Sequence, residues 1–288
     1  MAIDLHLHTH FSDGTFSPEE LAAHAARHGL QAVALTDHDT VEGCPRMQAA
    51  CEAEGLEFLP GSELTAEWEG HELHLLGYGL DIDHARLLRE LARFQKVRQN
   101  RIHEMAARLN RMGVGLQAEA VFELANCRSP GRPHVARALV QGGFCHSMDE
   151  AFERFLKWGK PAWVPKCKMS ATAAIDLVHE AGGVVVMAHP GLNRTDSCIP
   201  ALVEAGLDGL ECFHSKHSTP MSEHYLQVAE QHGLLVTGGS DCHGRSKGRP
   251  LIGSVRVPYA HLEALRRRWN AHRDSMVSPP AASEPAPN

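Results

Sequence analysis

Short apolar runs alternate along this chain with longer segments of helical periodicity. The apolar runs are typical of buried strands and fall at residues 31–36, 56–63, 72–78, 182–189, 209–214 and 234–241. Amphipathic spacing between most of them predicts helices, and before the first of these Ser17, Pro18 and Glu20 form a favourable N-terminal capping pattern. Repeated strand–helix–strand units predict an α/β fold with a parallel sheet, and we expect that sheet to close as a β/α barrel.

Two regions depart from this alternation. The turn at Glu69-Gly70 lies between two apolar runs and predicts a hairpin of antiparallel strands. From Asp83 to Ser170 the pattern is helical throughout, which indicates an insertion between two barrel strands. We therefore expect residues 1–82 plus 171–270 to form the barrel and residues 83–170 to form a helical cap. Residues 271–288 end in a segment rich in Pro and Ala and are expected to be a disordered tail.

The stretch "IDLHLH" at residues 3–8 alternates apolar and polar side chains. In a strand through His8, the imidazoles of His6 and His8 project from one face, and the two leucines point to the other. One alternative is a strand with a solvated polar face. Because Asp13 follows closely and can add an oxygen ligand, the segment favours a metal site.

Imidazoles and carboxylates lie at or near the ends of the apolar runs. In β/α barrels the active site forms at the C-terminal ends of the strands, so side chains distant in sequence meet there. A buried group of carboxylates needs positive charge, and a mixed imidazole and carboxylate set suits Mn²⁺, Zn²⁺ or Fe²⁺. The candidates are His6, His8, Asp13, His38, Glu63, His74, His189, His214, Asp241 and His243.

Composition narrows the class of protein. A formal net charge of -7 argues against a broad basic surface for nucleic acid. The eight cysteines are scattered without a C-x-x-C pair, which is typical of reduced thiols rather than disulfides or zinc fingers. Neither a signal peptide nor an apolar run of about 18 residues occurs. We expect a cytoplasmic enzyme with no membrane partner.

The motifs "DLHLHTHFSDG", "LTDHDT", "GSELTAE", "AHPG" and "GSDCHG" occur here in the order found in the polymerase and histidinol phosphatase (PHP) family. The chain resembles that family over residues 1 to 256. Its helical insertion is similar to that of the bacterial subgroup that hydrolyses nucleoside 3',5'-bisphosphates and related phosphoesters. The resemblance implies a distorted (β/α)7 barrel that binds two or three divalent metal ions.

The resemblance also implies a role for each candidate ligand. One metal would be held by His6, His8, Glu63 and Asp241. A second would be held by Glu63, His74 and His189, and a third by Asp13, His38 and His243. Many members have histidine where this chain has Asp13, and the oxygen ligand favours Mn²⁺ or Mg²⁺ at the third site.

Such a centre would hydrolyse a phosphate ester without a side-chain nucleophile. Paired metals, with Glu63 bridging them, lower the pKa of a shared water and supply hydroxide for in-line attack on phosphorus. We assign Asp13 to catalysis and to substrate binding as well as to metal binding. His214 or a metal-bound water would protonate the leaving group.

The insertion is locally basic and is expected to select the substrate. Arg98 and Arg101 share a helix face at i, i+3, with Asn100 beside them, although a solvated helix face is the alternative. Arg132 and His134 stand at a Gly-Pro-rich turn that opens a helix, where free backbone N–H groups favour a second phosphate. These five residues are the predicted substrate-binding set. Further candidates are Arg128, Arg137, Lys160, Lys166 and Arg249.

The sequence therefore predicts a metal-dependent phosphomonoesterase that removes the 3'-phosphate of nucleoside 3',5'-bisphosphates. A 5'-to-3' exoribonuclease is the nearest alternative, because the same site could cleave a phosphodiester at a short RNA end. An amidohydrolase also begins with His-x-His, and a metal-binding accessory domain would need no activity. We expect a small nucleotide substrate and no stable nucleic-acid partner.

Overall fold

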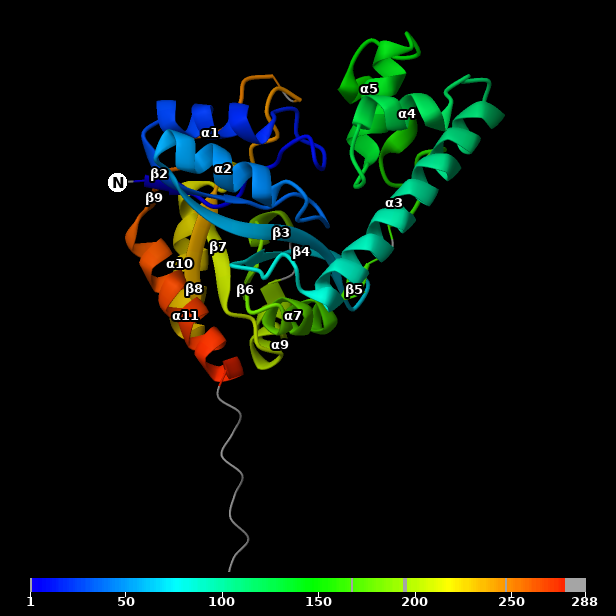
Figure 1. Cartoon of the computed structure of the whole chain (residues 1–288). Helices are drawn as coiled ribbons and strands as arrows, with labels where there is room; N and C mark the ends of the chain where they lie inside the picture. Colours follow the sequence, from blue (N-terminus) through cyan, green and yellow to red (C-terminus); the bar gives the residue numbers. More distant parts are fainter. Residues whose placement is uncertain (1, 167, 194–195, 247, 278–288) are drawn as a thin grey trace, which may run out of the picture.

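The computed structural model describes residues 2–166, 168–193, 196–246 and 248–277, whose strands form one strongly curved sheet (Figure 1). The strands are β1 (Ala2–Asp4), β2 (Leu30–Leu35), β3 (Glu57–Trp68), β4 (His71–Tyr78), β5 (Met169–Ser170), β6 (Val184–Met187), β7 (Gly209–His214), β8 (Leu235–Gly239) and β9 (Val257–Pro258). Their order is β8-β7-β6-β4-β3-β2-β1-β9, with β5 paired to β3. Strand β4 runs antiparallel to β3 and β6.

The segments that follow β1 and β8 close the sheet. The N–H of Leu5 donates to the carbonyl of Gly238 at 3.1 Å, and the N–H of Asp241 donates to the carbonyl of His6 at 2.9 Å. An isolated parallel bridge joins Leu7 to Cys242 just beyond them. The predicted α/β barrel is therefore confirmed, as a nearly closed sheet with a seam between the segments after β1 and β8.

Helices cover the barrel and extend away from it (Figure 1). Those beside the sheet are α1 (Pro18–Arg27), α2 (Cys44–Glu54), α7 (Ala171–Glu180), α8 (Pro190–Asn193), the 3₁₀ turn η2 (Asp196–Cys198), α9 (Ile199–Glu204), α10 (Thr219–His232) and α11 (Ala260–Val277). The capping arrangement predicted for α1 is confirmed: the Ser17 hydroxyl accepts from the N–H of Glu20, whose carboxylate accepts from the N–H of Ser17. These bonds satisfy donors that the first helical turn leaves free.

The sheet is apolar on both faces. In β2, Val33 and Leu35 join the cluster under the outer helices, whereas Ala32 and Ala34 join the cluster inside the barrel with Leu262 of α11. Alternating side chains thus face two cores, as expected of parallel strands buried on both sides. This explains why the strands appear in sequence as continuous apolar runs.

The predicted hairpin joins β3 to β4. Trp68 pairs with His71 across the turn. Glu69 and Gly70 have φ of 48° and 83°, the positive values that a type I′ hairpin turn requires at both central residues. This prediction is confirmed.

Two strand predictions are wrong in detail. Regular strand β1 ends at Asp4, and Leu5 packs inside the barrel while Leu7 packs under the outer helices, so the two leucines do not share a face. The buried carboxylate of Asp4 accepts from the N–H groups of His6 and Ser240, and these bonds replace the regular ladder. The expected strand end at Glu63 is also wrong, because β3 continues to Trp68 in order to pair with β4.

The predicted cap contains α3 (Ala85–Arg111), α4 (Ala118–Ala125), α5 (Arg132–Gln141), α6 (Met148–Ala151) and the π-helical turn η1 (Phe152–Leu156). It has a hydrophobic core of its own, which includes Ile102, Leu139 and Leu156. The first turns of α3 instead bury Leu87 and Leu91 in the barrel's outer core. One long helix therefore belongs to both cores, and Figure 1 shows it running from the barrel out to α4 and α5.

Residues 271–277 do not belong to the expected tail. Helix α11 continues to Val277, so residues 271–277 are helical, and the remainder, 278–288, lies outside the described residues. Arginines spaced along this helix hold it to the barrel; for example, Arg268 donates to the Asp208 carboxylate at 2.7 Å. The Pro- and Ala-rich composition applies to the last residues of the chain and not to this helical part.

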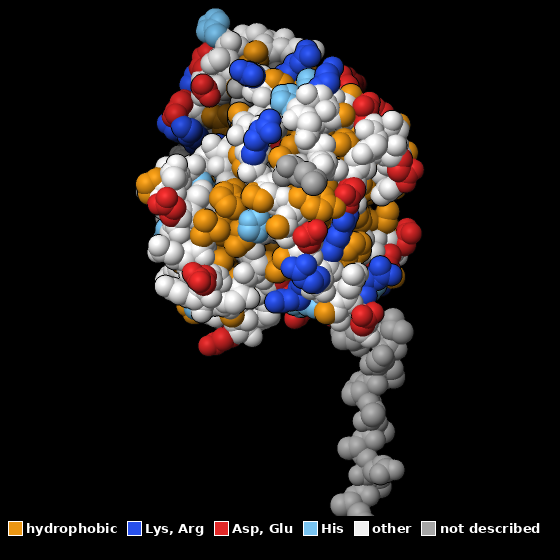
Figure 2. All heavy atoms as spheres, turned by 90° about the vertical axis from the view of Figure 1, so that its left-hand side faces the viewer, with side chains coloured by type: hydrophobic (Ala, Val, Ile, Leu, Met, Phe, Trp, Pro, Cys, Tyr) orange, Lys and Arg blue, Asp and Glu red, His pale blue; other side chains and the backbone are white. Residues whose placement is uncertain are grey.

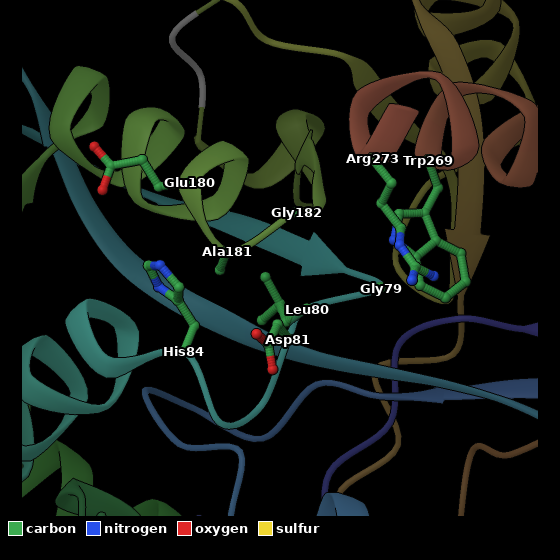
Figure 3. A pocket seen from close by; sticks show the side chains of 9 residues that line it. All are labelled: Gly79, Leu80, Asp81, His84, Glu180, Ala181, Gly182, Trp269 and Arg273. Atoms are coloured by element: carbon green, nitrogen blue, oxygen red, sulfur yellow. The ribbon is translucent and has the colours of Figure 1, made fainter. Parts of the chain in front are cut away.

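A cavity of about 440 Å³ lies at the end of the barrel where β4 finishes and β6 begins (Figure 3). Its walls include Asp81, Glu180, Trp269 and Arg273. The Trp269 ring covers Gly79, which has φ of +68°, and a Cβ there would stand 2.5 Å from the ring. Gly79 is therefore needed both for its backbone conformation and for this close approach.

The surface agrees with a chain that lacks a broad basic field. On the face shown in Figure 2, Lys and Arg side chains are interspersed with Asp and Glu and with apolar groups. Within the described residues, no helix has the length and apolar character needed to cross a membrane. Cys44, Cys51 and Cys212 are buried free thiols, in agreement with the expected reduced state.

Candidate metal centre

The candidate ligands converge at one end of the barrel, as the strand-end rule predicts. His6 and His8 follow β1, His38 follows β2, and His189 follows β6. Their imidazoles meet acidic side chains from β3 and from the segment after β8, and most of the set is buried. We call this group the metal centre; it comprises His6, His8, Asp13, His38, Glu63, His74, His189, Asp241 and His243.

Four donor atoms form a compact cage at its base. The Nε2 atoms of His6 and His8 are 3.1 Å apart, and each lies 3.3 Å from Glu63 Oε2. Asp241 Oδ1 lies 3.4 Å from the first nitrogen and 3.2 Å from the second. A tetrahedral cation with ligand bonds of about 2.0–2.1 Å has ligand–ligand edges of about 3.3–3.4 Å. The cage fits such a cation, and a cation would also explain why two imidazole nitrogens approach so closely.

Glu63 presents its two oxygens to two different groups. Oε2 faces His6 and His8, whereas Oε1 lies 2.6 Å from Nδ1 of His74 and 3.1 Å from Nε2 of His189. The side chain is only 1% exposed. One carboxylate can therefore serve two neighbouring cations, which is the bridging arrangement that the resemblance implies.

A third group lies beside the first. Asp13 Oδ1 is 3.1 Å from Nε2 of His243 and 3.9 Å from Nε2 of His38. Donor atoms of His8 also fall within reach of this group. In addition, His38 Nδ1 lies 3.0 Å from Glu63 Oε2, so its ring stands between the third group and the bridging carboxylate.

Electrostatics keep the acidic ligands ionised. Burial alone would raise the pKa of Glu63, but the imidazoles of His38 and His74 hold it well below its usual range. Burial disfavours charge on His8, yet hydrogen bonds to Asp241 and Glu63 raise its pKa to about 10. Burial lowers the pKa of His38 to about 3, although Glu63 and Asp13 oppose this shift. The centre thus combines anionic oxygens with imidazoles that must lose protons before they can ligate.

Strained backbone accompanies the ligands. His189, Asp241 and Asp39 have φ of 32°, 54° and 49°, in the left-handed region that non-glycine residues rarely adopt. The N–H of His189 is held by Glu211 Oε2 at 2.7 Å, and the N–H of Asp39 donates to the carbonyl of Glu63 at 3.0 Å. The N–H of Asp241 likewise donates to the carbonyl of His6. Hydrogen bonds therefore hold the backbone conformations from which His189 and Asp241 enter the centre.

Sequence reasoning missed Glu211. It is fully buried in β7, and its Oε1 lies 2.9 Å from Nδ1 of His6, which leaves Nε2 of that ring facing the cage. Asp37 holds the neighbouring loop in place, because its carboxylate accepts hydrogen bonds from the Thr9 N–H and the Ser12 hydroxyl. A carboxylate inside an apolar run, as in "GLECFH", was the signal for Glu211.

His214 is buried beside the first group. Its Nε2 lies 3.5 Å from Asp241 Oδ2, and its Nδ1 accepts from the N–H of Lys216 at 3.1 Å. The Lys216 contact orients the ring so that Nε2 faces the metal centre.

The predicted substrate-binding residues are divided between exposed and buried positions. Arg98 donates to Asp39 at 2.8 Å through Nε, and Arg101 is buried with its Nε bonded to the carbonyl of Val164 at 2.8 Å. His134 is buried and its Nδ1 accepts from the N–H of Gly131 at 3.0 Å, so it caps its own helix. Asn100 is exposed on α3 and does not share these buried positions.

Arg132 and Lys166 complete a basic cluster with Arg98 and Arg101. Burial, reinforced by Arg132 and Arg98, lowers the pKa of Arg101 to about 9. Burial also lowers the pKa of Lys166, whose Nζ lies 2.7 Å from Glu72. Two carboxylates, Asp39 and Glu72, thus face four cationic side chains in the basic cluster.

Cap side chains also bind the loops that carry metal ligands. The Ser129 hydroxyl donates to the carbonyl of His38 at 2.6 Å, and Arg137 donates to the carbonyl of Asp13. Arg137, which sequence analysis placed among further substrate contacts, therefore bonds to the barrel backbone.

Comparisons with known proteins agree with this geometry. The sequence profile of the PHP domain matches residues 4–159. The chain is 33% identical to the 5'-3' exoribonuclease Rnm of Salmonella typhimurium over 92% of this chain and 93% of that protein. It is 34% identical to the 3',5'-nucleoside bisphosphate phosphatase of Chromobacterium violaceum over 87% and 90%. A Bifidobacterium adolescentis structure assigned to the metal-dependent phosphoesterases superposes with a TM-score of 0.86 at 34% identity, covering 92% of this chain and 96% of the other.

Proposed function

This chain belongs to the PHP domain family, and we propose that it is a metal-dependent phosphomonoesterase that removes the 3'-phosphate of nucleoside 3',5'-bisphosphates. The observation that carries the proposal is the pairing of the metal centre with the basic cluster. The metal centre suits the phosphate that is hydrolysed, and the basic cluster offers excess positive charge to the other phosphate. Two relatives that each align over most of this chain act on phosphate esters by their names.

We propose that the centre binds two or three divalent cations, with Mn²⁺ favoured and Zn²⁺, Fe²⁺ or Mg²⁺ as alternatives. His6, His8, Glu63 and Asp241 would hold the first; Glu63, His74 and His189 the second; and Asp13, His38 and His243 the third. When bound, such cations make water nucleophilic near neutral pH and offset charge on phosphate. The four-atom cage and the divided contacts of Glu63 support this assignment.

The chain's own side chains supply orientation and a proton. Arg132 and Arg101 would hold the second phosphate, with Arg98, Asn100 and His134 as further contacts, while Asp13 borders both metal and substrate. His214 in its imidazolium form, which becomes neutral on giving up the Nε2 proton, or a metal-bound water would protonate the leaving oxygen; His214 Nε2 lies 3.5 Å from Asp241. Asp241 also lies beside the ring as an acceptor that keeps it oriented.

The proposal assigns residues 1–82 plus 171–270 to the barrel and 83–170 to the cap. The separate hydrophobic core of the cap supports that division. The net charge of -7 and the mixed-sign face in Figure 2 favour a small nucleotide over long nucleic acid. The buried thiols suit a cytoplasmic location.

A 5'-to-3' exoribonuclease is the second candidate. The Salmonella relative carries that name and covers nearly the whole chain. The same centre could cleave a phosphodiester if a short RNA end entered beneath the cap.

The test is phosphate release by the purified protein loaded with Mn²⁺. Substrates are nucleoside 3',5'-bisphosphates, mononucleotides, sugar phosphates and 5'-phosphorylated oligoribonucleotides. Release from the bisphosphates and its loss in Glu63→Gln would support the proposal. Glu67→Gln, on the same strand but paired with Lys168, is the matched control. Shortened oligomers without free phosphate would replace the proposal with the exoribonuclease.

A further inference from the structure

A second cavity, of about 540 Å³, borders the metal centre on the side of the cap. Asp13 and His243 form its wall on the barrel side, and Pro133, Met148 and Phe152 form its wall on the cap side. Cavities of roughly 300–1,000 Å³ are the usual size for small-molecule sites. The cavity therefore lies where part of a substrate must lie when its phosphate occupies the centre.

The chemistry of its cap wall differs from that of the centre. The centre and the basic cluster offer charge, whereas Pro133, Met148 and Phe152 are apolar. A phosphate gains little from such a wall because it is polar over its whole surface, and a ribose offers only small C–H faces between its hydroxyls. A flat aromatic ring gains from it, through burial, stacking on Phe152 and contact with the Met148 thioether.

We propose that this cavity is the nucleobase subsite of the enzyme, with the base stacked on Phe152. This inference rests on the proposed function and adds the part of the substrate that the metal centre does not read. Ser147 and Asp149 also line the cavity and can bond to polar edges of the base. Stacking accepts every base, since each has an aromatic face, so the subsite selects nucleotides over base-free sugar phosphates without selecting a sequence.

The local backbone supports the placement. Phe152 begins the π-helical turn η1, directly after the short helix α6 that carries Met148. Such turns are rare and are frequent at functional sites. Here the turn sets Phe152 at the edge of the cap core, where it packs partly buried and lines the cavity, while Phe155 and Leu156 of the same turn are buried in that core.

The subsite also fits the position of the basic cluster. Arg132 immediately precedes Pro133 at the start of α5, and its Nη1 donates to the carbonyl of Leu156 at 3.4 Å. The next residue, Pro133, lines the cavity. A nucleoside bisphosphate would thus place one phosphate at the centre, the other at Arg132, and its base over Phe152.

Equilibrium binding tests the subsite independently of turnover. We would measure the affinity of AMP and of ribose 5-phosphate, which lacks the base, for the Mn²⁺-loaded protein. Wild type should bind AMP about tenfold more tightly or better, the range that one stacked base provides. Phe152→Ala should remove most of that preference and leave the affinity for ribose 5-phosphate unchanged.

Two further variants guard against a folding artefact. Phe152→Leu keeps apolar bulk in the cap and should retain part of the preference, and Phe144→Leu, on the cap but away from this cavity, should retain all of it. Equal affinity of wild type for AMP and ribose 5-phosphate would overturn the subsite, as would equal losses for both ligands in Phe152→Leu. Either result could accompany full phosphatase activity, whereas failure of the proposed function would appear as absent phosphate release despite base-dependent binding.

Discussion

The barrel carries its functional side chains on strand ends that meet at one point, whereas the cap reaches that point from helices built on a separate core. In the barrel, donor atoms such as His6 Nε2 and His8 Nε2 stand 3.1 Å apart. In the cap, Arg98 and Lys166 each pair with a barrel carboxylate, Asp39 and Glu72. Cap side chains hold the loops beside the metal centre, and under the proposed function the barrel would supply the chemistry while the cap recognises the substrate.

The largest effect should follow removal of a barrel ligand. Asp241→Ala would take away one corner of the four-atom cage. Metal content should fall, and phosphate release should fall about 1,000-fold or more, because several kcal/mol of charge stabilisation is lost. Metal analysis and steady-state kinetics measure both. Asp176→Asn, exposed on α7, is the control, and unchanged turnover of Asp241→Ala would refute the assignment of the first metal.

A smaller effect is expected for Glu211→Gln, which leaves every ligand in place. The change weakens the hydrogen bonds of this side chain to the His6 ring and to the His189 N–H. Metal affinity should fall about 10- to 100-fold, as for other carboxylates that orient metal-binding histidines. A titration with Mn²⁺ measures it, and excess Mn²⁺ should restore turnover. The exposed Glu204→Gln serves for comparison; equal affinities in the two variants would remove Glu211 from the centre's support.

The cap is tested by Arg132→Ala. Loss of a charged hydrogen bond to the second phosphate should raise KM about tenfold and leave kcat nearly unchanged. Arg111→Ala removes an exposed arginine elsewhere on the cap and should change neither value. A large fall in kcat with constant KM would mean that the cap takes part in chemistry, contrary to the comparison.

The smallest effect concerns a contact between the two regions. Ser129→Ala deletes the hydrogen bond from the cap to the carbonyl of His38. One neutral hydrogen bond contributes about 0.5–1.5 kcal/mol, so the affinity of the third metal should fall about two- to tenfold. Calorimetric titration of metal into the apoprotein resolves such a change. No change would show that the loop carrying His38 holds its position without the cap.

The barrel was more predictable from sequence than the cap for a physical reason. A buried strand appears as an apolar run, and a polar side chain such as Glu63 or His189 at the end of that run stands out in the sequence. The turn at Glu69-Gly70 likewise follows from local backbone preference. The irregular pairing at Asp4 depends instead on Ser240, which is distant in sequence. The extension of β3 to Trp68 depends on pairing with β4 across the hairpin, which the apolar periodicity does not mark.

In the cap, the same residue types serve several purposes. Arg98 and Arg101 were assigned to the substrate because they are basic and share a helix face, and His134 because it stands at a turn that opens a helix. The structure gives each a protein partner, Asp39, the Val164 carbonyl and the Gly131 N–H. Two of those partners lie on other elements of the fold, and the third is recognisable only once the start of α5 is known. Spacing along the sequence therefore could not show whether a basic side chain bonds to the protein or is available to a substrate.

The seam of the barrel gives the metal a second consequence. A short series of backbone hydrogen bonds joins the segments after β1 and β8, including those to Gly238 and His6, and each segment contributes donor atoms to the same cage. A bound cation would therefore hold the segment after β1 to the segment after β8. Removing the metal with a chelator should speed amide hydrogen exchange at Leu5 and Asp241 before exchange in the outer helices increases. Loss of the metal would then open the seam of the barrel.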